Sequence, residues 1–271
     1  MKDMKNSNSP KVTIITVCYN VADNLEKTIK SVSNQTFKDF EYIVIDGGSK
    51  DNTIDIIKMY QHIITKWVSE PDHGIYDAMN KGIDKSEGEW VNFMNAGDTF
   101  VNNSVLESLF KGRIYPQASV IYGDAVLVFP NIGKVDRSYE NIRTEAVPLN
   151  INHQSSFIKG DVIRRIKYDT SYKIASDGNT FLKIYNEGGS FKYIKMPIAA
   201  FETVGGISAK QLVRRKKEYM RIRNVKQGSI LWYKSLLIPY LKTFLWKVLP
   251  AEYLQRRQYK HICKLYNKND K

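Results

Sequence analysis

Short β-branched runs alternate with helical patterns over the first hundred residues, and this alternation constrains the fold more than any other feature of the sequence. The predicted strands span residues 11–17 (KVTIITV), 41–45 (EYIVI), 63–68 and 90–94. Between them, small and apolar residues recur at helical spacing, and Asp23 and Asn24 are expected to cap the first helix. Repeats of strand, turn and helix predict an α/β fold, with a mostly parallel central sheet and helices on both faces.

Polar or flexible residues follow each predicted strand. They are Tyr19 and Asn20 after the first strand, then Asp46, Gly48, Ser49 and Asp51, then Glu70 and Asp72, and finally Asp98. The carboxyl ends of parallel strands meet at one edge of a sheet, so we expect these side chains to border a single crevice. Any one of these turns is explained by turn chemistry alone, but together they carry more acids than turns require. The phosphate-binding patterns GxxxxGK[ST] and GxGxxG do not occur, which argues against a P-loop protein and an ordinary dinucleotide-binding domain.

The cysteine content and the N-terminal residues favour a protein of the reducing cytosol. Cys18 and Cys263 lie far apart in the 271-residue sequence without metal-ligand spacing, so neither a disulfide scaffold nor a zinc site is expected. Residues 1–10 are polar and contain no apolar run, so they do not resemble a signal peptide. We expect this segment to be a disordered leader.

The positive charge of the chain belongs to its C-terminal part. The formal net charge is +13, and residues 210–271 hold 17 Lys and Arg against 3 Asp and Glu, which leaves 24 against 25 in the rest. This distribution argues against nucleic acid as a partner of the nearly neutral first part and directs the question of an anionic partner to the C-terminus.

The C-terminal part is predicted to be a basic amphipathic helical tail. Residues 211–225 mix Arg and Lys with apolar residues, and residues 230–249 are aromatic and aliphatic but contain three lysines and Pro239. These interruptions argue against a membrane-spanning helix. The aromatic residues beside lysines predict a helix lying on an anionic membrane surface. The alternative is a helical appendage that packs on the first part of the chain or on a second subunit.

Pro10 to about Ser208 resembles a family 2 glycosyltransferase with the GT-A fold. The segments that carry the resemblance are TVCYN (16–20), SVSNQTFKDFEYIVIDGGSKDNT (31–53), SEPDHGIYDAMNKG (69–82), EGEWVNFMNAGD (87–98), YGD (122–124), HQSSF (153–157), SD (176–177) and FETVGGIS (201–208). The resemblance implies a catalytic domain at 11–209, with a nucleotide-sugar half at about 11–100 and an acceptor half at about 101–209. The tail would then be 210–271.

The resemblance also implies the donor site. The residues expected to bind the nucleotide-sugar are Tyr19, Asn20, Asp46, Gly48, Ser49, Asp51, Asp72, Gly74, Tyr76, Asn80, Lys81, Asn95, Gly97 and Asp98. Tyr19 and Asp46 would flank the base. Asp98 matches the last acid of the family's metal-binding motif, which holds Mn²⁺ or Mg²⁺ on the diphosphate. Asn95 and Gly97 stand where other members often carry acids, so protein ligation of the metal would rest on Asp98.

The acceptor side is implied by three further segments. Asp124, His153 and Gln154 are expected to line it, and Asp177 matches the catalytic carboxylate, although as the start of a helix it could also be a simple cap. Ser176 replaces the Glu that often precedes this Asp in relatives. Residues 120–122 and 125–129 are predicted to form two short strands. Residues 130–150 lack periodicity and predict no regular element, and 201–208 would border the active site.

The implied reaction is an inverting transfer of a sugar from a nucleoside diphosphate, by default a UDP-sugar, to an acceptor hydroxyl. A glycan or lipid-linked acceptor in surface-polysaccharide synthesis would place the protein in the cytoplasm, peripheral on the inner membrane face. One alternative is a nucleotidyltransferase, which predicts a basic, glycine-rich phosphate loop that residues 18–24 do not supply. The other is a non-catalytic nucleotide-sugar-binding protein, which the missing acids at 95, 97 and 176 would suit.

Overall fold

A computed structural model describes residues 9–138, 151–203 and 211–266 of the chain. Its strands are β1 (Val12–Cys18), β2 (Phe40–Asp46), β3 (Lys66–Ser69), β4 (Trp90–Phe93), β5 (Thr99–Phe100), β6 (Val120–Phe129), β7 (Gly133–Arg137), β8 (Ser156–Lys159) and β9 (Phe191–Glu202). Its helices are α1 (Ala22–Ser33), α2 (Thr53–Met59), α3 (Ile75–Lys85), α4 (Val105–Phe110), α5 (Gly160–Ile166), α6 (Ser176–Asn186), α8 (Leu212–Ile222), α9 (Ile230–Val248) and α10 (Ala251–Tyr266), with a 3₁₀ turn at His153–Ser155. The predicted leader lies almost wholly outside these residues.

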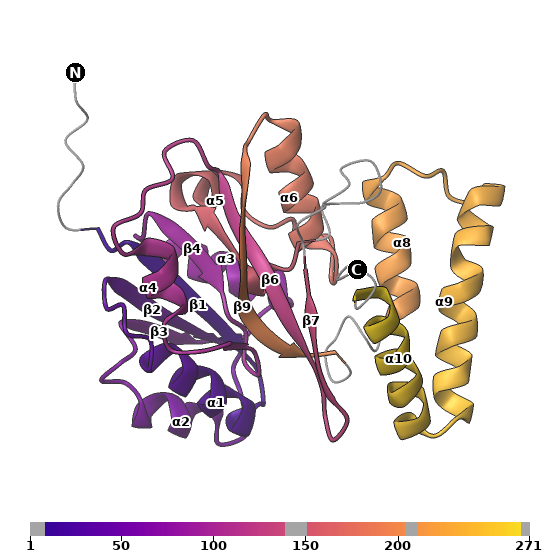
Figure 1. The fold of residues 1–271 in the computed structure, drawn as a ribbon, viewed down its shortest axis with the longest axis horizontal. Helices are drawn as coiled ribbons and strands as arrows, with labels where there is room; N and C mark the ends of the chain where they lie inside the picture. Colours follow the sequence, from indigo (N-terminus) through magenta and orange to yellow (C-terminus); the bar gives the residue numbers. More distant parts are fainter. Residues whose placement is uncertain (1–8, 139–150, 204–210, 267–271) are drawn as a thin grey trace.

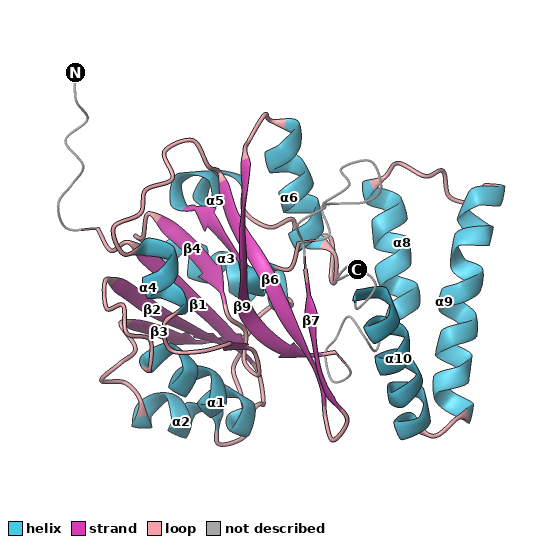
Figure 2. Cartoon of the chain, in the orientation of Figure 1, coloured by secondary structure: helices cyan, strands magenta, loops and turns pink. Residues whose placement is uncertain are grey.

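The strands form one mixed sheet in the order β3-β2-β1-β4-β8-β6-β9-β5, with β7 paired to β6 (Figure 2). The four strands from the N-terminal part are parallel to one another, β6 and β9 are also parallel, and β8 joins the two groups by antiparallel pairing. The predicted α/β architecture is therefore confirmed.

Helices cover both faces of the sheet (Figure 1). On one face, α1, α2 and α4 pack on residues such as Ile14 and Val44, and on the other, α3, α5 and α6 pack on Ile15 and Ile45. Neighbouring residues of one strand thus enter different cores, which explains why β1 and β2 are apolar without polar alternation.

The carboxyl ends of β1, β2 and β4 meet where the strand order reverses. The chain adds β2 and β3 on one side of β1 and then returns to place β4 on the other side. A crevice forms at such a switch point because the loops after the flanking strands diverge. The polar residues that follow the strands lie at this edge.

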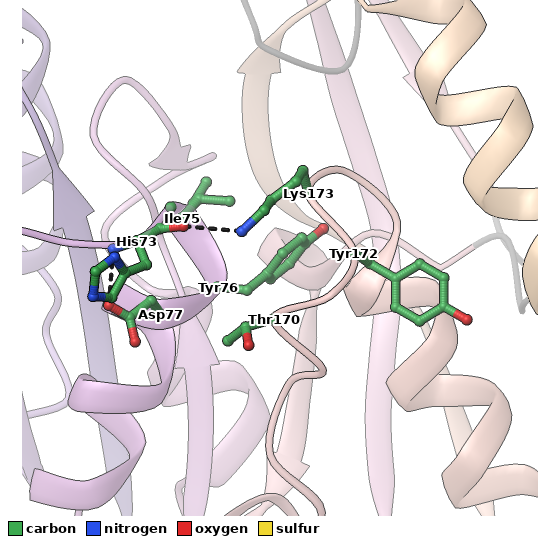
Figure 3. A pocket seen from close by; sticks show the side chains of 8 residues that line it. His73, Ile75, Tyr76, Asp77, Thr170, Tyr172 and Lys173 are labelled. Atoms are coloured by element: carbon green, nitrogen blue, oxygen red, sulfur yellow. Dashed lines mark hydrogen bonds between the residues drawn. The ribbon is translucent and has the colours of Figure 1, made fainter.

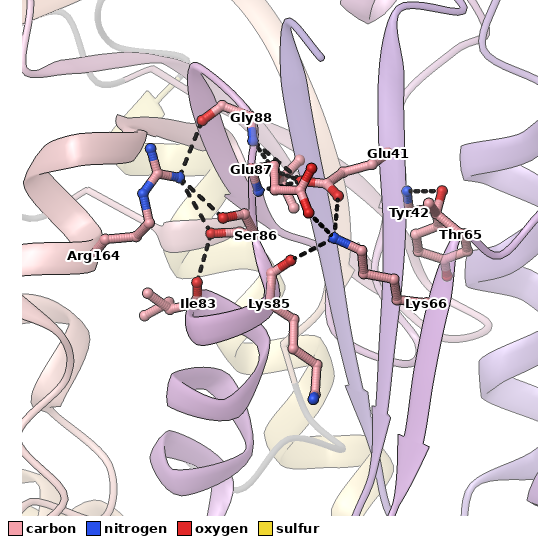
Figure 4. A network of polar contacts seen from close by, with 11 residues as sticks. Glu41, Tyr42, Thr65, Lys66, Ile83, Lys85, Ser86, Glu87, Gly88 and Arg164 are labelled. Carbon is pink, nitrogen blue, oxygen red and sulfur yellow. Dashed lines mark hydrogen bonds and ion pairs between the residues drawn. The ribbon is translucent and has the colours of Figure 1, made fainter. Parts of the chain in front are cut away.

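A polar network closes the opposite end of these strands (Figure 4). Buried Glu41 accepts hydrogen bonds from Thr13 Oγ1 and from the backbone N–H of Gly88 (3.1 Å), and Lys66 pairs with both Glu41 and Glu87. Arg164 adds bonds to the carbonyl oxygens of Ser86 (3.3 Å) and Gly88 (3.2 Å). These contacts satisfy the buried charge of Glu41 within the fold, so this end of the sheet has a structural role.

Two expectations about secondary structure are wrong. Residues 120–129, which read as two strands, form the single strand β6, with an irregular register against β9 at Gly123 and Asp124. Residues 133–137 form β7, a hairpin partner of β6, although residues 130–150 show no periodicity. Pairing with β6 stabilises β7, and a single sequence does not reveal that contact. Residues 139–150 lie outside the described part.

The tail forms three helices beside β7 and α6 (Figure 1). Tyr259 of α10 packs against Phe129 of β6, with ring centroids 5.4 Å apart, and α8 packs between the first part of the chain and α9. Within the described ranges, none of the helices has the length and apolar character needed to cross a bilayer.

Candidate active site

The loops after β1 and β2 are tied together by side chains. The backbone N–H of Asn20 donates to Ser49 Oγ (2.8 Å), and the N–H of Lys50 donates to Asn20 Oδ1 (2.8 Å). Asn20 has a φ of 51°, a left-handed conformation that Asn tolerates better than most residues. The two loops therefore form one unit at the carboxyl edge of the sheet.

Asp46 is a fully buried part of this unit. Its Oδ2 accepts from the N–H groups of Gly48 (3.1 Å) and Ser49 (3.0 Å) and from Ser69 Oγ (2.6 Å), while its Oδ1 accepts from Ser49 Oγ. Gly48 supports this turn with a φ of 80°. Contact with a base would require Asp46 to exchange one of these partners, so its evident role here is to shape the loop.

Asp51 explains why the predicted cap of α1 is wrong. The helix begins at Ala22, and neither Asp23 nor Asn24 caps it. Instead, the N–H of Val21 donates to Thr53 Oγ1 (3.0 Å), and the N–H of Ala22 donates to Asp51 Oδ2 (3.4 Å). Hydrogen bonds, first from Thr53 and also from Ala22, lower the pKa of Asp51. The neighbouring loop thus supplies the acceptors that the helix start needs.

Tyr19 and Asp72 meet at Gly47. A Cβ atom on Gly47 would lie 2.8 Å from Asp72 Oδ2 and 3.3 Å from Tyr19 Cδ2. Tyr19 is 59% exposed, as a ring that stacks on a ligand must be, whereas Asp72 pairs with Lys81 (2.7 Å). Burial raises the pKa of Asp72, and Lys81 opposes that rise.

Three of the predicted donor residues on and before α3 are committed to protein contacts. Lys81 lies within 4 Å of Glu70, Asp72 and Asp77. Both ends of the Asn80 amide bond the backbone of Tyr168 (2.9 Å each). The Tyr76 hydroxyl donates to the carbonyl of Ile174 (2.8 Å) and lies 3.1 Å from Asp177 Oδ1. Asn80 and Tyr76 therefore join α3 to residues 168–177, whereas Lys81 holds the segment before α3.

Asp98 follows β4 and lies beside Gln154, whose Nε2 donates to Asp98 Oδ2 (3.0 Å). Burial raises the pKa of Asp98 to about 6, and His153 and Gln154 limit this rise. Thr28 of α1 fixes the loop, because its hydroxyl donates to the Asp98 carbonyl (2.8 Å) and accepts from the N–H of Gly97 (2.9 Å). No sequence pattern identifies Thr28, which is typical of an ordinary helix residue.

Asp177 lies in the first turn of α6 and does not cap it; the N-cap residue is Ala175. His153 Nδ1 is 3.1 Å from Asp177 Oδ2, and the N–H of Gly178 donates to Oδ1 (2.8 Å). Burial alone would raise the pKa of Asp177, but hydrogen bonds from His153, Gly178 and Tyr76 hold it below the usual value. Both carboxylate oxygens of Asp177 therefore have protein partners.

His153 and Gln154 join the two acids. They are consecutive residues of the 3₁₀ turn, and one bonds Asp177 while the other bonds Asp98. His153 Nε2 also contacts Asn95 Nδ2 (3.1 Å), which links the turn to the β4 loop. The structure thus places both residues between the acids, whereas the sequence suggested that they line the acceptor side. Asp124, also assigned to that side, bonds the hydroxyl of Tyr193 (2.9 Å).

A shallow hollow of about 140 Å³ opens beside Tyr76 (Figure 3). It lies between the start of α3 and residues 170–173, where Lys173 Nζ donates to the carbonyl of His73 (3.0 Å). Small-molecule pockets are typically ~300–1,000 Å³, so this hollow is too small for a nucleotide-sugar. Neither Tyr19 nor Asp98 lines it.

The residues around Asp98 offer oxygen atoms to a divalent cation. No group of three or more His, Cys, Asp or Glu side chains suited to a metal occurs among the residues the structure describes. Asn95 Oδ1, however, is buried without a hydrogen-bond partner in that part of the chain. An amide oxygen next to a carboxylate suits Mg²⁺ or Mn²⁺, which keep several water or phosphate ligands.

Acids at the switch point of an α/β sheet, with a second carboxylate brought to them from another element, are typical of a ligand-binding site in this fold class. The sequence model described as "Glycosyl transferase family 2" matches residues 13–186, and the chain belongs to this family and is a transferase enzyme. A PGL/p-HBAD biosynthesis glycosyltransferase of Mycobacterium bovis is 29% identical over 210 residues, covering 74% of this chain and 80% of the relative. An uncharacterized glycosyltransferase of Mycobacterium tuberculosis is 32% identical over 190 residues, covering 65% and 70%.

Solved structures show the same fold at low sequence identity. S. aureus TarS 1–349 in complex with UDP-GlcNAc gives a TM-score of 0.62 at 17% identity, over 91% of this chain and 78% of that chain. The mannosyltransferase PcManGT from Pyrobaculum calidifontis, in complex with GDP-Man and Mn²⁺, gives 0.63 at 16%, over 97% and 76%. The chain spans only 43% of a longer TarS chain. These similarities confirm the GT-A fold.

Proposed function

We propose that the protein transfers a sugar from a nucleoside diphosphate to an acceptor hydroxyl with inversion at the anomeric carbon. The observation that carries this proposal is the single turn whose adjacent residues, His153 and Gln154, bond Asp177 and Asp98. An in-line displacement needs one group at the attacking hydroxyl and another at the leaving diphosphate. The turn links two carboxylates from different elements, and this reaction needs two such groups.

Asp177 is the proposed general base. Its pKa lies below the usual value, so it is ionised at neutral pH and can accept the proton of the acceptor hydroxyl as the new bond forms. Positioned bases of this kind contribute about 10²–10⁴-fold to a rate. His153 Nε2 faces the amide nitrogen of Asn95, which leaves the proton on Nδ1 for donation to Asp177. His153 therefore orients the carboxylate.

Asp98 and Asn95 are the proposed ligands on the donor side. A bound Mn²⁺ or Mg²⁺ would neutralise charge on the leaving diphosphate as a Lewis acid. Asp98 supplies a carboxylate, and Asn95 supplies an oxygen without another partner. Tyr19, exposed next to Asp72, would stack on the base, and the unit of residues 46–51 would support it.

A UDP-sugar is the proposed donor, by analogy with the TarS complexes with UDP and UDP-GlcNAc. PcManGT is a neighbour with GDP-Man, so the nucleotide base has to be tested. A thermal-shift screen of UDP, GDP, dTDP and CMP, each with Mn²⁺ and with EDTA, is the direct experiment. We expect UDP with Mn²⁺ to give the largest stabilisation, since a ligand at 100 times its Kd adds about 2.7 kcal/mol. No stabilisation by any nucleotide would exclude a donor site.

We further propose that the acceptor is a glycan or lipid-linked sugar and that the protein works on the inner membrane face in polysaccharide synthesis. The support is the uncovered apolar face of α9, whose large side chains Ile230, Leu237, Leu241 and Phe244 are 55–74% exposed. Trp232, Leu236 and Thr243 of the other side are buried or half-buried. The catalytic domain at 11–209 and the tail at 210–271 would then act together at the bilayer.

Slow hydrolysis of UDP-GlcNAc by the purified protein with Mn²⁺ measures turnover of the proposed donor without an acceptor. We expect release of UDP that stops in Asp177→Asn. Binding of UDP-GlcNAc without any release would contradict the proposed donor and the role of Asp177.

A further inference from the structure

We propose that Glu218, in the basic tail, is a positioning residue for the catalytic carboxylate Asp177. This inference rests on the proposed role of Asp177 as the base. It makes α8 part of the active site, although the sequence places the end of the catalytic domain at residue 209.

Glu218 holds the backbone directly before α6. Its Oε1 accepts from the N–H of Lys173 (2.9 Å), and its Oε2 accepts from the N–H groups of Ile174 (2.8 Å) and Ala175 (3.0 Å). Three successive amides thus converge on one carboxylate that is only 9% exposed. Hydrogen bonds to a charged acceptor are about twice as strong as those between neutral groups.

The segment that Glu218 holds is connected to Asp177 in two ways, along the chain through Ala175 and through the hydroxyl of Tyr76. Ala175 is the N-cap of α6, and Asp177 lies two residues later in its first turn. The carbonyl of Ile174 accepts from the Tyr76 hydroxyl, which also contacts Asp177. If the amides of 173–175 lost their acceptor, the start of α6 and the Tyr76 contact would shift together.

Further contacts show that α8 is fitted to this segment. The guanidinium of Arg221 lies 3.7 Å from the centre of the Tyr172 ring, and Tyr219 and Ile222 pack with Tyr172 and Ala175. Glu218 is also the one acid of residues 211–225, among basic residues such as Arg214, which it pairs with at 3.4 Å. A lone acid in a basic helix is the sequence signal that could have identified it.

The test compares Glu218→Ala and Glu218→Gln with the matched control Glu252→Gln. Glu252 lies on α10, is exposed, and pairs with Arg256 four residues away, as Glu218 pairs with Arg214. Hydrogen–deuterium exchange of the full-length protein is measured first. We expect the amides of 173–175 to exchange about 10- to 100-fold faster in Glu218→Ala, because their charge-assisted hydrogen bonds are lost. Glu218→Gln keeps one acceptor oxygen and should fall in between, while the control and the amides of β1 stay unchanged.

The second readout follows Asp177 without requiring turnover. The chain has four histidines, so the imidazole resonances are few enough to resolve by NMR, and His153→Gln assigns the one that bonds Asp177. That resonance should shift in Glu218→Ala and stay in place in Glu252→Gln.

Turnover is the third readout. In Glu218→Ala, turnover of UDP-GlcNAc at saturation should fall about 10- to 100-fold, as for a misplaced catalytic group, with UDP affinity unchanged.

Two results would overturn the proposal. One is unchanged exchange at 173–175 in Glu218→Ala, which would mean that the carboxylate does not hold the segment. The other is faster exchange with an unmoved His153 resonance, which would mean that the segment does not position Asp177. If the wild-type protein binds no nucleotide and releases no UDP, the proposed function fails, while the exchange and NMR results still decide the role of Glu218.

Discussion

Asp98 and Asp177 carry the same functional group in different surroundings. Burial raises the pKa of Asp98 to about 6, whereas the hydrogen bonds of Asp177 outweigh its burial and lower its pKa. Environments that separate the pKa values of two acids at one site are typical of divided catalytic roles. The buried carboxylate of Asp98 is stabilised by a positive partner, which suits binding of a metal ion. The carboxylate of Asp177 stays ionised, which suits acceptance of a proton.

Replacement of Asp177 by Asn tests the base directly. We expect kcat to fall by about 10²–10⁴-fold, because the amide cannot accept the proton, while the affinity for UDP with Mn²⁺ stays within about threefold, a change of about 0.6 kcal/mol. Initial rates of UDP release and calorimetric UDP binding measure the two quantities. A parallel loss of affinity and rate would reassign Asp177 to donor binding.

His153→Gln tests the pH dependence. The bonds from His153 are the main contributions that lower the pKa of Asp177, so without them burial prevails and the pKa rises. Turnover needs the ionised carboxylate and is lost as the pH falls through that pKa. The acid limb of kcat should therefore move to higher pH. The measurement uses saturating donor and Mn²⁺, which keep Asp98 bound to the metal. An acid limb of kcat that does not move would show that His153 does not set the pKa of Asp177.

At the scale of elements, the loops after β1 and β2 and the segment before α3 depend on one another. Gly47 permits the approach of Tyr19 and Asp72, and Asp51 completes the start of α1. Lys81, from within α3, holds the carboxylates of the segment before it. Each loop is therefore shaped by atoms from another.

Gly47→Ala should weaken UDP binding. Its Cβ would lie 2.8 Å from Asp72 Oδ2, so Asp72 or Tyr19 must move. The movement displaces side chains proposed to flank the donor, and we expect it to appear as a lower UDP affinity in calorimetry. Gly112→Ala provides the contrast: its Cβ meets no atom within 4 Å, but its φ is 67°. That variant should lower the melting temperature and leave UDP affinity unchanged.

At the scale of the whole molecule, one face of α9 carries large apolar side chains that no other described element covers. Its exposed apolar residues occupy about half of the helix circumference, with Lys234 inside this half and Lys242 and Lys247 at its two borders. The helix carries no acid. Two copies meeting through this face would bring two tails of net charge +14 together, so charge favours an anionic membrane surface over a second subunit.

Vesicle sedimentation tests this preference. We expect the protein to bind vesicles containing phosphatidylglycerol. High salt should dissociate the protein from these vesicles, since the attraction to lipid is partly electrostatic. Leu237→Gln should reduce binding about tenfold or more, because a buried Leu contributes about 1.5–3 kcal/mol. Leu265→Gln on α10, at a residue 53% exposed, is the control. A dimer in solution that Leu237→Gln dissociates would instead show that a second copy covers α9.

Much of the fold was predictable because the evidence for it is local. The runs at 11–17 and 41–45 are strands in the structure, and the polar residues after them do lie at one edge. β7 was missed because pairing with β6 creates it. The contacts of Asn80, Tyr76 and Glu218 could not be predicted, since their partners lie 88, 98 and about 44 residues away in the sequence.

By itself, the sequence determined the α/β class, the family and the identity of the acids, because periodicity and turn chemistry act between residues close along the chain. Tertiary structure alone decided what each acid does. Packing brings His153 and Gln154 between Asp177 and Asp98 and brings Glu218 under the start of α6. A carboxylate's charge state and orientation depend on burial and on donors from distant segments, and these exist only once the chain has folded.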